Sequence, residues 1–226
     1  PVIIAIIVKR NDPTYMGQVR PSNYEIMRDR MEMEFIKYDQ AKMIQKFSLQ
    51  HDADFLYIRF AGREYRIGRK NGRVEWYSDV KAAYVHADYT VSMTIFDVLA
   101  WSRPDCHLDG HFVPVNKLKG TTMSSSPATG LFAKQAKLFT GHCNELQAAC
   151  LKLGGKPGNI GDVSSTIPLF DFLPVVLQFW DADEEFEAYM KFMWDRNATD
   201  FMHFETVNFA TMHLIDRLKE TMEETR

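Results

Sequence analysis

The chain has little cysteine and no long hydrophobic run. Its 226 residues include three cysteines, Cys106, Cys143 and Cys150. A small odd number without regular spacing excludes a disulfide scaffold and favours free thiols in a reducing compartment. The apolar opening from Val2 to Val8 is seven residues long, whereas a transmembrane helix needs about 20 residues, and no small-residue cleavage site follows it. We therefore expect a cytoplasmic protein without a signal peptide that contacts no membrane.

Glycine and proline are also scarce, at 12 and 9 residues, which excludes collagen and low-complexity linker proteins. An excess of either charge is missing as well, because 27 Lys and Arg face 30 Asp and Glu, for a net charge of -3. Such a balance provides no general positive field, so we predict no nucleic-acid partner. What remains is an ordinary globular composition, 46% hydrophobic and 25% charged, on a chain long enough to bury a sizeable core.

Charge is nevertheless distributed unevenly along the chain. Residues 59–73 contain six bases and one acid, whereas residues 180–226 contain twelve acids and five bases. One explanation is two solvated faces. The alternative is a salt-sensitive interaction module, in which the basic segment of one subunit meets the acidic segment of another in a homodimer.

Hydrophobic periodicity and turn residues predict the secondary structure. Ser22-Asn23-Tyr24-Glu25 is a capping box that starts a helix, and Asn71-Gly72 is a strong hairpin signal. Helices are predicted over residues 22–38, 39–47, 88–101, 132–153 and 207–222, from apolar steps of three and four. Strands are predicted over residues 2–8, 55–60, 63–68, 74–77, 111–115, 175–180 and 189–194, and a polar loop over 121–130.

This order of elements predicts an α+β fold, in which three to four amphipathic helices pack on antiparallel strands. No internal repeat is visible in the sequence. We predict that residues 1–21 form an N-terminal strand and linker extension and that residues 22–226 form a single α+β domain.

Motifs for cofactors and metals are missing. No dinucleotide fingerprint, nucleophile elbow or zincin motif occurs. The run from Cys106 to His111 (CHLDGH) has no second ligand pair with zinc-finger spacing, and the acidic segment 181–187 lacks the spacing of a calcium loop. We assign no metal ligands, and the sequence does not identify a cofactor. It also leaves open which cation, if any, segment 181–187 binds.

Aromatic and polar side chains gather in the last fifty residues. The predicted strands 175–180 and 189–194 are rich in Phe and Trp, and acids and a histidine follow them. An apolar wall with a few polar groups is the usual composition of a ligand pocket. We therefore predict a small-molecule or cofactor-binding accessory protein. The candidate ligand-binding residues are Trp180, Asp183, Glu185, Trp194, Asp195, His203 and Glu205.

A catalytic alternative uses the same side chains. His203 and Glu205 would face one side of an extended chain, an arrangement suited to proton transfer. The enzyme would be a carboxylate- or metal-assisted hydrolase or isomerase, with Glu205 or Asp183 as general base and His203 as acid or orienting group. The sequence leaves open whether the chain is an enzyme.

Several longer motifs carry a resemblance to a known family. They are Lys37-Tyr38-Asp39-Gln40, Tyr65-Arg66-Ile67, the run from Met93 to Leu99, Leu153-Gly154-Gly155, Phe172-Leu173-Pro174, the run from Phe179 to Phe186, Trp194-Asp195 and the run from His203 to Thr206. On these residues the chain from Ser22 onward resembles domain-of-unknown-function family 3786, uncharacterised proteins of anaerobic bacteria and archaea. Some members look like fusions to the four-cysteine module of corrinoid iron–sulfur proteins, which implies, by association, anaerobic one-carbon or corrinoid metabolism. This chain lacks that module.

Overall fold

The structure is a computed structural model that describes residues 22–121 and 131–224. The predicted strand at 2–8, the predicted extension and most of the polar loop at 121–130 lie outside these residues. The first half of the chain contains α1 (Asn23–Phe35), α2 (Gln40–Phe47), β1 (Gln50–His51), β2 (Phe55–Phe60), β3 (Arg63–Gly68), β4 (Val74–Ser78), β5 (Ala83–His86) and α3 (Tyr89–Phe96), which continues into a π-helical turn (Asp97–Trp101).

The second half begins with β6 (Phe112–Pro114). It continues with α4 (Ala133–Ala136), α5 (Cys143–Lys152), β7 (Lys156–Pro157), β8 (Val163–Phe170), β9 (Leu173–Trp180), β10 (Tyr189–Asp195), α6 (Ala198–Phe201) and α7 (Phe204–Glu223). Among the described helices, none has the length and apolar character needed to cross a membrane.

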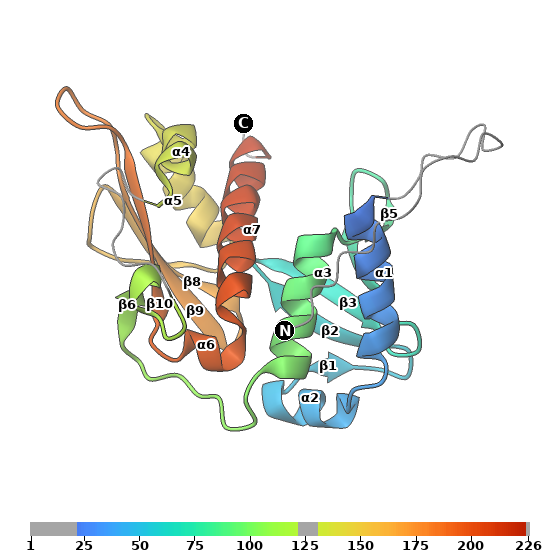
Figure 1. The fold of residues 1–226 in the computed structure, drawn as a ribbon. Coiled ribbons are helices and arrows are strands. Elements are labelled where there is room, and N and C mark those ends of the chain that lie inside the picture. The colour runs from blue at the N-terminus through green and yellow to red at the C-terminus, as the bar shows by residue number, and fades with distance from the viewer. Residues whose placement is uncertain (1–21, 122–130, 225–226) are drawn as a thin grey trace, which may run out of the picture.

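The strands form one ten-stranded sheet in the order β5-β4-β3-β2-β8-β9-β10-β6, with β1 beside β2 and β7 beside β8. Helices α1, α3, α7 and α5 contact one another in that order and lie across one face of the sheet (Figure 1). Burial alternates along the strands: in β10, Met190, Phe192 and Trp194 are buried and the residues between them are partly exposed. The predicted α+β class with helices on antiparallel strands is confirmed.

The two halves repeat one order of elements. With β5 and α6 left aside, two helices, a short strand, a hairpin, a further strand and a closing helix occur first as α1, α2, β1, β2-β3, β4 and α3, and again as α4, α5, β7, β8-β9, β10 and α7. Strands β2 and β8 pair antiparallel in the middle of the sheet, and the strands follow outward from this pair as β2-β3-β4 on one side and β8-β9-β10 on the other. This topology corresponds to an approximate two-fold axis between the halves. The sequence shows no such repeat because the paired elements differ in length and residue type.

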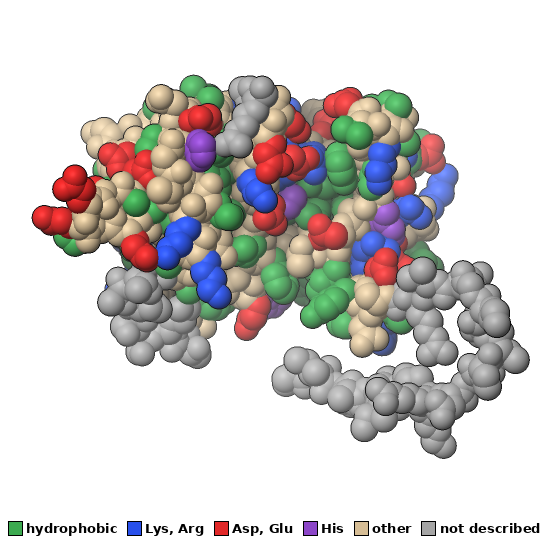
Figure 2. Space-filling model, turned by 90° about the horizontal axis from the view of Figure 1, so that it is seen from above, with side chains coloured by type: hydrophobic (Ala, Val, Ile, Leu, Met, Phe, Trp, Pro, Cys, Tyr) green, Lys and Arg blue, Asp and Glu red, His purple; other side chains and the backbone are tan. Residues whose placement is uncertain are grey.

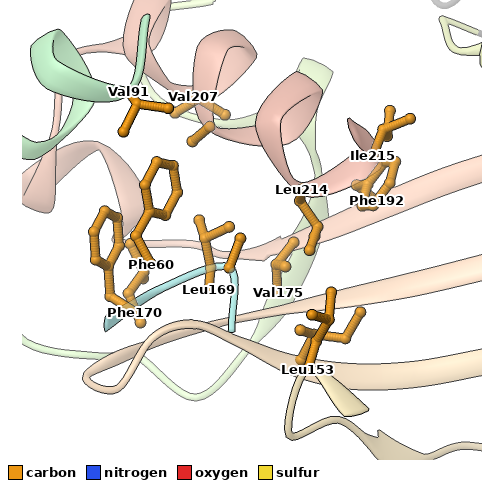
Figure 3. Packing of buried hydrophobic residues seen from close by; sticks show 14 of the residues in the cluster. Phe60, Val91, Leu153, Leu169, Phe170, Val175, Phe192, Val207, Leu214 and Ile215 are labelled. Carbon is orange, nitrogen blue, oxygen red and sulfur yellow. The ribbon is translucent and has the colours of Figure 1, made fainter. Parts of the chain in front are cut away.

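Few backbone contacts join the two halves, and aromatic side chains pack across the joint between them. Strands β2 and β8 pair only at Phe60 and Phe170, beside a hydrogen bond of 2.7 Å from Ala61 N–H to the Leu169 carbonyl. The two Phe rings stack with centroids 4.6 Å apart, beneath Val91 of α3 and Val207 of α7 (Figure 3). Side-chain packing, and not the strand ladder, therefore holds the halves together.

Local sequence signals account for the helix ends. The predicted capping box is present, since Ser22 and Glu25 exchange hydrogen bonds at the start of α1. The carboxylate of Asp39 caps α2, and the carboxylate of Asp88 caps α3. A side-chain acceptor at this position satisfies amide groups that have no partner within the helix.

The continuous helix predicted over residues 132–153 is wrong. The chain forms α4, a short 3-10 turn and then α5, and Gly141 between them has a φ of +75°. That left-handed conformation suits glycine and interrupts a helix. The apolar period persists across the break because both pieces pack on the same core.

A partly buried imidazole lies at the joint between the halves. The ring of His213 on α7 lies 4.6 Å from the ring of Phe60, and its Nε2 shares a hydrogen bond of 3.1 Å with the Tyr65 hydroxyl. Burial lowers the pKa of His213 to about 4, and the neighbouring cations of Arg217 and Arg63 act in the same direction. The side chain is therefore neutral in the folded protein at pH 7.

This neutral histidine predicts a loss of stability in mild acid. The unfolded chain takes up a proton near pH 6.5, whereas the folded chain does so only near pH 4, so the free energy of unfolding falls as pH decreases between these values. A pKa difference of this size corresponds to about 3 kcal/mol. Urea unfolding at pH 7 and pH 4.5 should show a smaller loss in His213→Gln than in the unmodified protein. Parallel pH profiles of the two proteins would contradict this prediction.

Candidate functional site

The structure places the seven predicted ligand-binding residues in three separate places. Trp180 ends β9 and Asp183 and Glu185 lie in the loop that follows, Trp194 and Asp195 end β10, and His203 and Glu205 lie at the start of α7. Trp180 pairs with Tyr189, the first residue of β10, and Asp195 is the last. Six residue steps along a strand span about 20 Å. Trp180 and Asp195 therefore do not meet in one cavity.

Trp194 and Asp195 belong to the core. Their exposed fractions are 0% and 1%. The Asp195 carboxylate accepts hydrogen bonds from the backbone N–H groups of Asp109 at 3.0 Å, Gly110 at 2.8 Å and Asn197 at 2.9 Å. This carboxylate therefore organises the turn within the Cys106–His111 segment, a role that leaves no surface for a ligand.

The predicted pairing of His203 with Glu205 is wrong, because helix α7 begins between them. His203 donates its backbone N–H to Asp97 Oδ2 at 2.8 Å, and its Nδ1 lies 2.5 Å from Asp97 Oδ1. Asp97 is the buried first residue of the π-helical turn. Glu205 lies exposed in the first turn of α7. The His203–Asp97 pair joins the end of α3 to the start of α7.

The remaining candidates lie in or beside a cavity of about 510 Å³, which we call the acidic aromatic pocket. It lies at the end of the β9–β10 hairpin, which projects beyond the sheet (Figure 1). Its lining residues are Asp162, Trp180, Asp181, Asp183, Phe186, Glu187, Ala188 and Tyr189. The pocket contains Trp180 and Asp183 of the predicted set, and Glu185 lies in the same loop.

Hairpin register provides the aromatic wall of this pocket. Trp180 and Tyr189 are opposite each other in the β9–β10 ladder, and their ring centroids are 5.5 Å apart. Gly161 passes beside them with a φ of +79°, and a Cβ there would lie 2.4 Å from the Phe179 carbonyl oxygen. Only glycine lets the chain run this close to the indole. The aromatic residues of the predicted strands 175–180 and 189–194 already indicated this wall, although Tyr189 was not predicted as a ligand-binding residue.

The carboxylate of Asp183 stabilises the turn in the β9–β10 loop. Asp183 Oδ1 accepts the backbone N–H of Glu185 at 2.8 Å and of Phe186 at 2.7 Å. This turn places the Phe186 side chain, which is 68% exposed, at the mouth of the pocket. Aspartate commonly forms such turns because its short side chain reaches the backbone two residues ahead.

Asp181 connects the pocket to the break between α4 and α5. Its carboxylate accepts the Gly141 N–H at 3.0 Å and the Ala182 N–H at 2.8 Å. Burial opposes its ionisation, but these hydrogen bonds outweigh that effect and hold the pKa of Asp181 below its ordinary value. The Asp181 backbone N–H in turn donates to Asp162 Oδ2 at 2.8 Å. The carboxylate of Asp181 is therefore ionised at neutral pH.

The lining of the pocket is negatively charged. It contains four carboxylates and no Lys or Arg, and acidic side chains gather at this end of the molecule (Figure 2). Lys137 forms an ion pair of 2.8 Å with Glu187, and both side chains are more than half exposed. That pair offsets one of the four charges. No ion pair joins the other three lining carboxylates to a described residue, so the pocket keeps most of its negative charge.

A second hollow, of about 620 Å³, lies between α2 and the π-helical turn. Its charged side chains are already engaged within the protein. Lys46 Nζ donates to the Ser102 carbonyl at 2.9 Å and to the Ser102 hydroxyl at 2.7 Å, and Lys42 pairs with Asp39 at 3.5 Å. It is larger than the acidic aromatic pocket, but its two Lys and one Asp give an excess of only one positive charge, and both Lys side chains already have partners within the protein.

The cysteines offer no nucleophile. Burial raises the pKa of Cys150 to about 12, and burial together with Asp181 raises the pKa of Cys143 to about 11. Burial also raises the pKa of Cys106. All three are free thiols, and nucleophilic chemistry requires the thiolate.

The basic segment 59–73 meets acids of its own chain. Arg63 pairs with Glu220 at 2.5 Å, Arg66 with Glu75 at 2.7 Å and Lys70 with Asp54 at 2.9 Å. These pairs reduce the charge available to a second subunit. The homodimer stays a prediction.

Comparison with known proteins places most of the chain in one family. Residues 39–217 match the family model described as Domain of unknown function (DUF3786). No curated protein and no solved structure matches the chain. The matched range includes every residue of the acidic aromatic pocket.

Proposed function

The chain belongs to the family described as Domain of unknown function (DUF3786), and because that description names no activity, we propose a function from the pocket geometry. The protein binds a small organic cation, an alkylammonium group, in the acidic aromatic pocket. The observation that carries the proposal is the combination of Trp180 and Tyr189 with four carboxylates and no lining Lys or Arg.

The physical basis is the attraction of a cation to aromatic faces and carboxylates. The face of an indole or phenol ring carries negative charge density and attracts an ammonium group by about 0.5 to 2 kcal/mol. The carboxylates of Asp162, Asp181 and Asp183 add a Coulombic attraction that an anion would not experience. A volume of about 510 Å³ lies within the range of small-molecule sites. An organic cation therefore fits the pocket better than a neutral or anionic ligand.

Replacement of Trp180 tests the proposal. We expect tetramethylammonium to bind in saturation-transfer NMR titrations, and Trp180→Ala to raise its Kd about 5- to 30-fold through loss of one aromatic face. Asp183→Asn keeps the turn-forming oxygen but removes a charge, so it should weaken binding less. Raised salt should weaken binding in the unmodified protein, because the carboxylates are screened.

Matched controls separate this site from general surface attraction. Trp101→Ala removes a partly exposed indole outside the pocket and should leave the Kd unchanged. Tert-butyl alcohol, a neutral molecule of similar shape, should not bind. Equal binding of the neutral probe, or unchanged affinity in Trp180→Ala, would refute the proposal.

A cytoplasmic location and a role in anaerobic or corrinoid metabolism stay predictions. The free thiols are compatible with a reducing compartment. We favour an accessory binding protein over a hydrolase, because the pocket lining contains no Ser, Thr, Cys or His that could act as a nucleophile or transfer a proton beside its carboxylates.

A further inference from the structure

Two carboxylates and an imidazole converge between α1 and β5, at the opposite end of the sheet from the acidic aromatic pocket. One ligand atom from each of Asp29, Glu32 and His86 lies within 4.8 Å of the other two. The closest pair is His86 Nε2 and Glu32 Oε1, at 2.5 Å. Among the described residues, no other group of three or more His, Cys, Asp or Glu side chains converges this closely.

Helix geometry and strand position create the cluster. Asp29 and Glu32 are three residues apart on α1, which puts both carboxylates on one face of the helix. His86 is the last residue of edge strand β5. Arg28 closes one side by donating to the Ala87 carbonyl at 3.1 Å. The ligand atoms therefore come from two elements that the fold holds side by side.

Glu32 is buried and closely packed in this cluster. It is 7% exposed, and the turn at Gly72 packs so closely that a Cβ there would lie 2.0 Å from the Glu32 carbonyl oxygen. A buried carboxylate is costly unless a cation or strong hydrogen bonds accompany it. Within the described part of the chain, the ion pair of Glu32 is with His86 alone, while Arg28 pairs with Asp29.

We propose that Asp29, Glu32 and His86 bind one divalent transition-metal ion, of the Zn²⁺ or Mn²⁺ type. An imidazole with two carboxylates suits these ions, whereas Mg²⁺ and Ca²⁺ prefer sites made of oxygen alone. Both Arg28 contacts go to Asp29 Oδ1, at 3.0 and 2.8 Å, so Oδ2 can turn toward the ion. Asp29 is exposed enough to make this rotation.

The ion would clamp α1 to the edge of the sheet. Asp29 and Glu32 precede the family-matched range of residues 39–217, whereas His86 lies within it. The metal would therefore fasten a helix outside the matched range to a strand inside it. Three protein ligands would leave coordination positions for water.

Metal titration of chelator-treated protein tests the site. We expect one Zn²⁺ and, in a separate titration, one Mn²⁺ per chain by calorimetry, with a higher Tm in both cases because the ion binds the folded state. Mg²⁺ at the same concentration should leave the Tm unchanged. Asp29→Asn and Glu32→Gln should each weaken Mn²⁺ binding at least 10-fold, and Mn²⁺ avoids the thiols that could attract Zn²⁺.

The control is a similar pair elsewhere on the surface. His111 and Asp109 lie 3.0 Å apart, and His111 is exposed, so His111→Gln should leave Mn²⁺ binding unchanged. Should Glu32→Gln fail to fold, the exposed Asp29→Asn variant still gives the answer. Absence of Mn²⁺ binding would overturn the proposal, and equal binding by Asp29→Asn would overturn it by showing an adventitious ion only. Tetramethylammonium binding in Asp29→Asn is independent and should be unchanged.

Discussion

Replacing Phe60 with alanine is expected to lower the free energy of unfolding by about 4 kcal/mol, because a buried phenylalanine removed from a packed core costs roughly 3 to 5 kcal/mol. Phe60 is 0% exposed. Its ring contacts Phe170 of β8 and His213 of α7, so the cavity would open where the halves meet.

Equilibrium urea unfolding, followed by fluorescence and circular dichroism, measures this effect. We expect one cooperative transition at a lower midpoint by both methods, because both halves lose packing at the same place. Phe186→Ala, which removes a phenylalanine that is 68% exposed, should change the midpoint little. Two separate transitions in Phe60→Ala, one of them at the original midpoint, would show that the halves do not share one core.

Replacing Asp195 with alanine is expected to destabilise the protein by about 3 to 5 kcal/mol. The carboxylate is buried and accepts three backbone N–H groups. Alanine would leave these donors without their acceptor. Asp195→Asn retains one acceptor oxygen and should lose about half as much stability.

Hydrogen exchange locates the effect of Asp195→Ala. The amides of Asp109 and Gly110 should exchange faster than in the unmodified protein, since the carboxylate protects them. The same substitution at exposed Asp79 should change the free energy of unfolding by less than about 0.5 kcal/mol. Unchanged exchange at Gly110, with full stability retained, would assign the Asp195 carboxylate no structural role.

Local signals predicted most elements of the fold. The capping box at Ser22, the Asn71-Gly72 turn and the aromatic strands from 175 and from 189 all correspond to observed elements. Strand β8 was not predicted. Its burial is nearly continuous, so the alternation that identifies a half-exposed strand is missing. The break at Gly141 was not predicted either, because the apolar period continues through it.

The candidate site was predictable only where residues are close in the hairpin. Trp180 and Asp183 lie together because one short loop joins β9 and β10. Asp195 ends a seven-residue strand and Glu205 follows that strand, so both lie far from that loop. Asp162 and Tyr189 were missed because their position depends on strand register, which the sequence alone does not reveal.

The approximate two-fold axis between β2 and β8 affects which amino-acid substitutions each half of the chain can accumulate. A half on its own would expose a strand edge and a helix face, and a second half covers both, as a partner does in a symmetric dimer. Identical subunits must change together, because one sequence specifies both. Covalent fusion removes that constraint, so the first half can hold Glu32 and His86 while the second holds Trp180 and Asp183. The two halves of this chain therefore share one order of elements, but each half has a different candidate site.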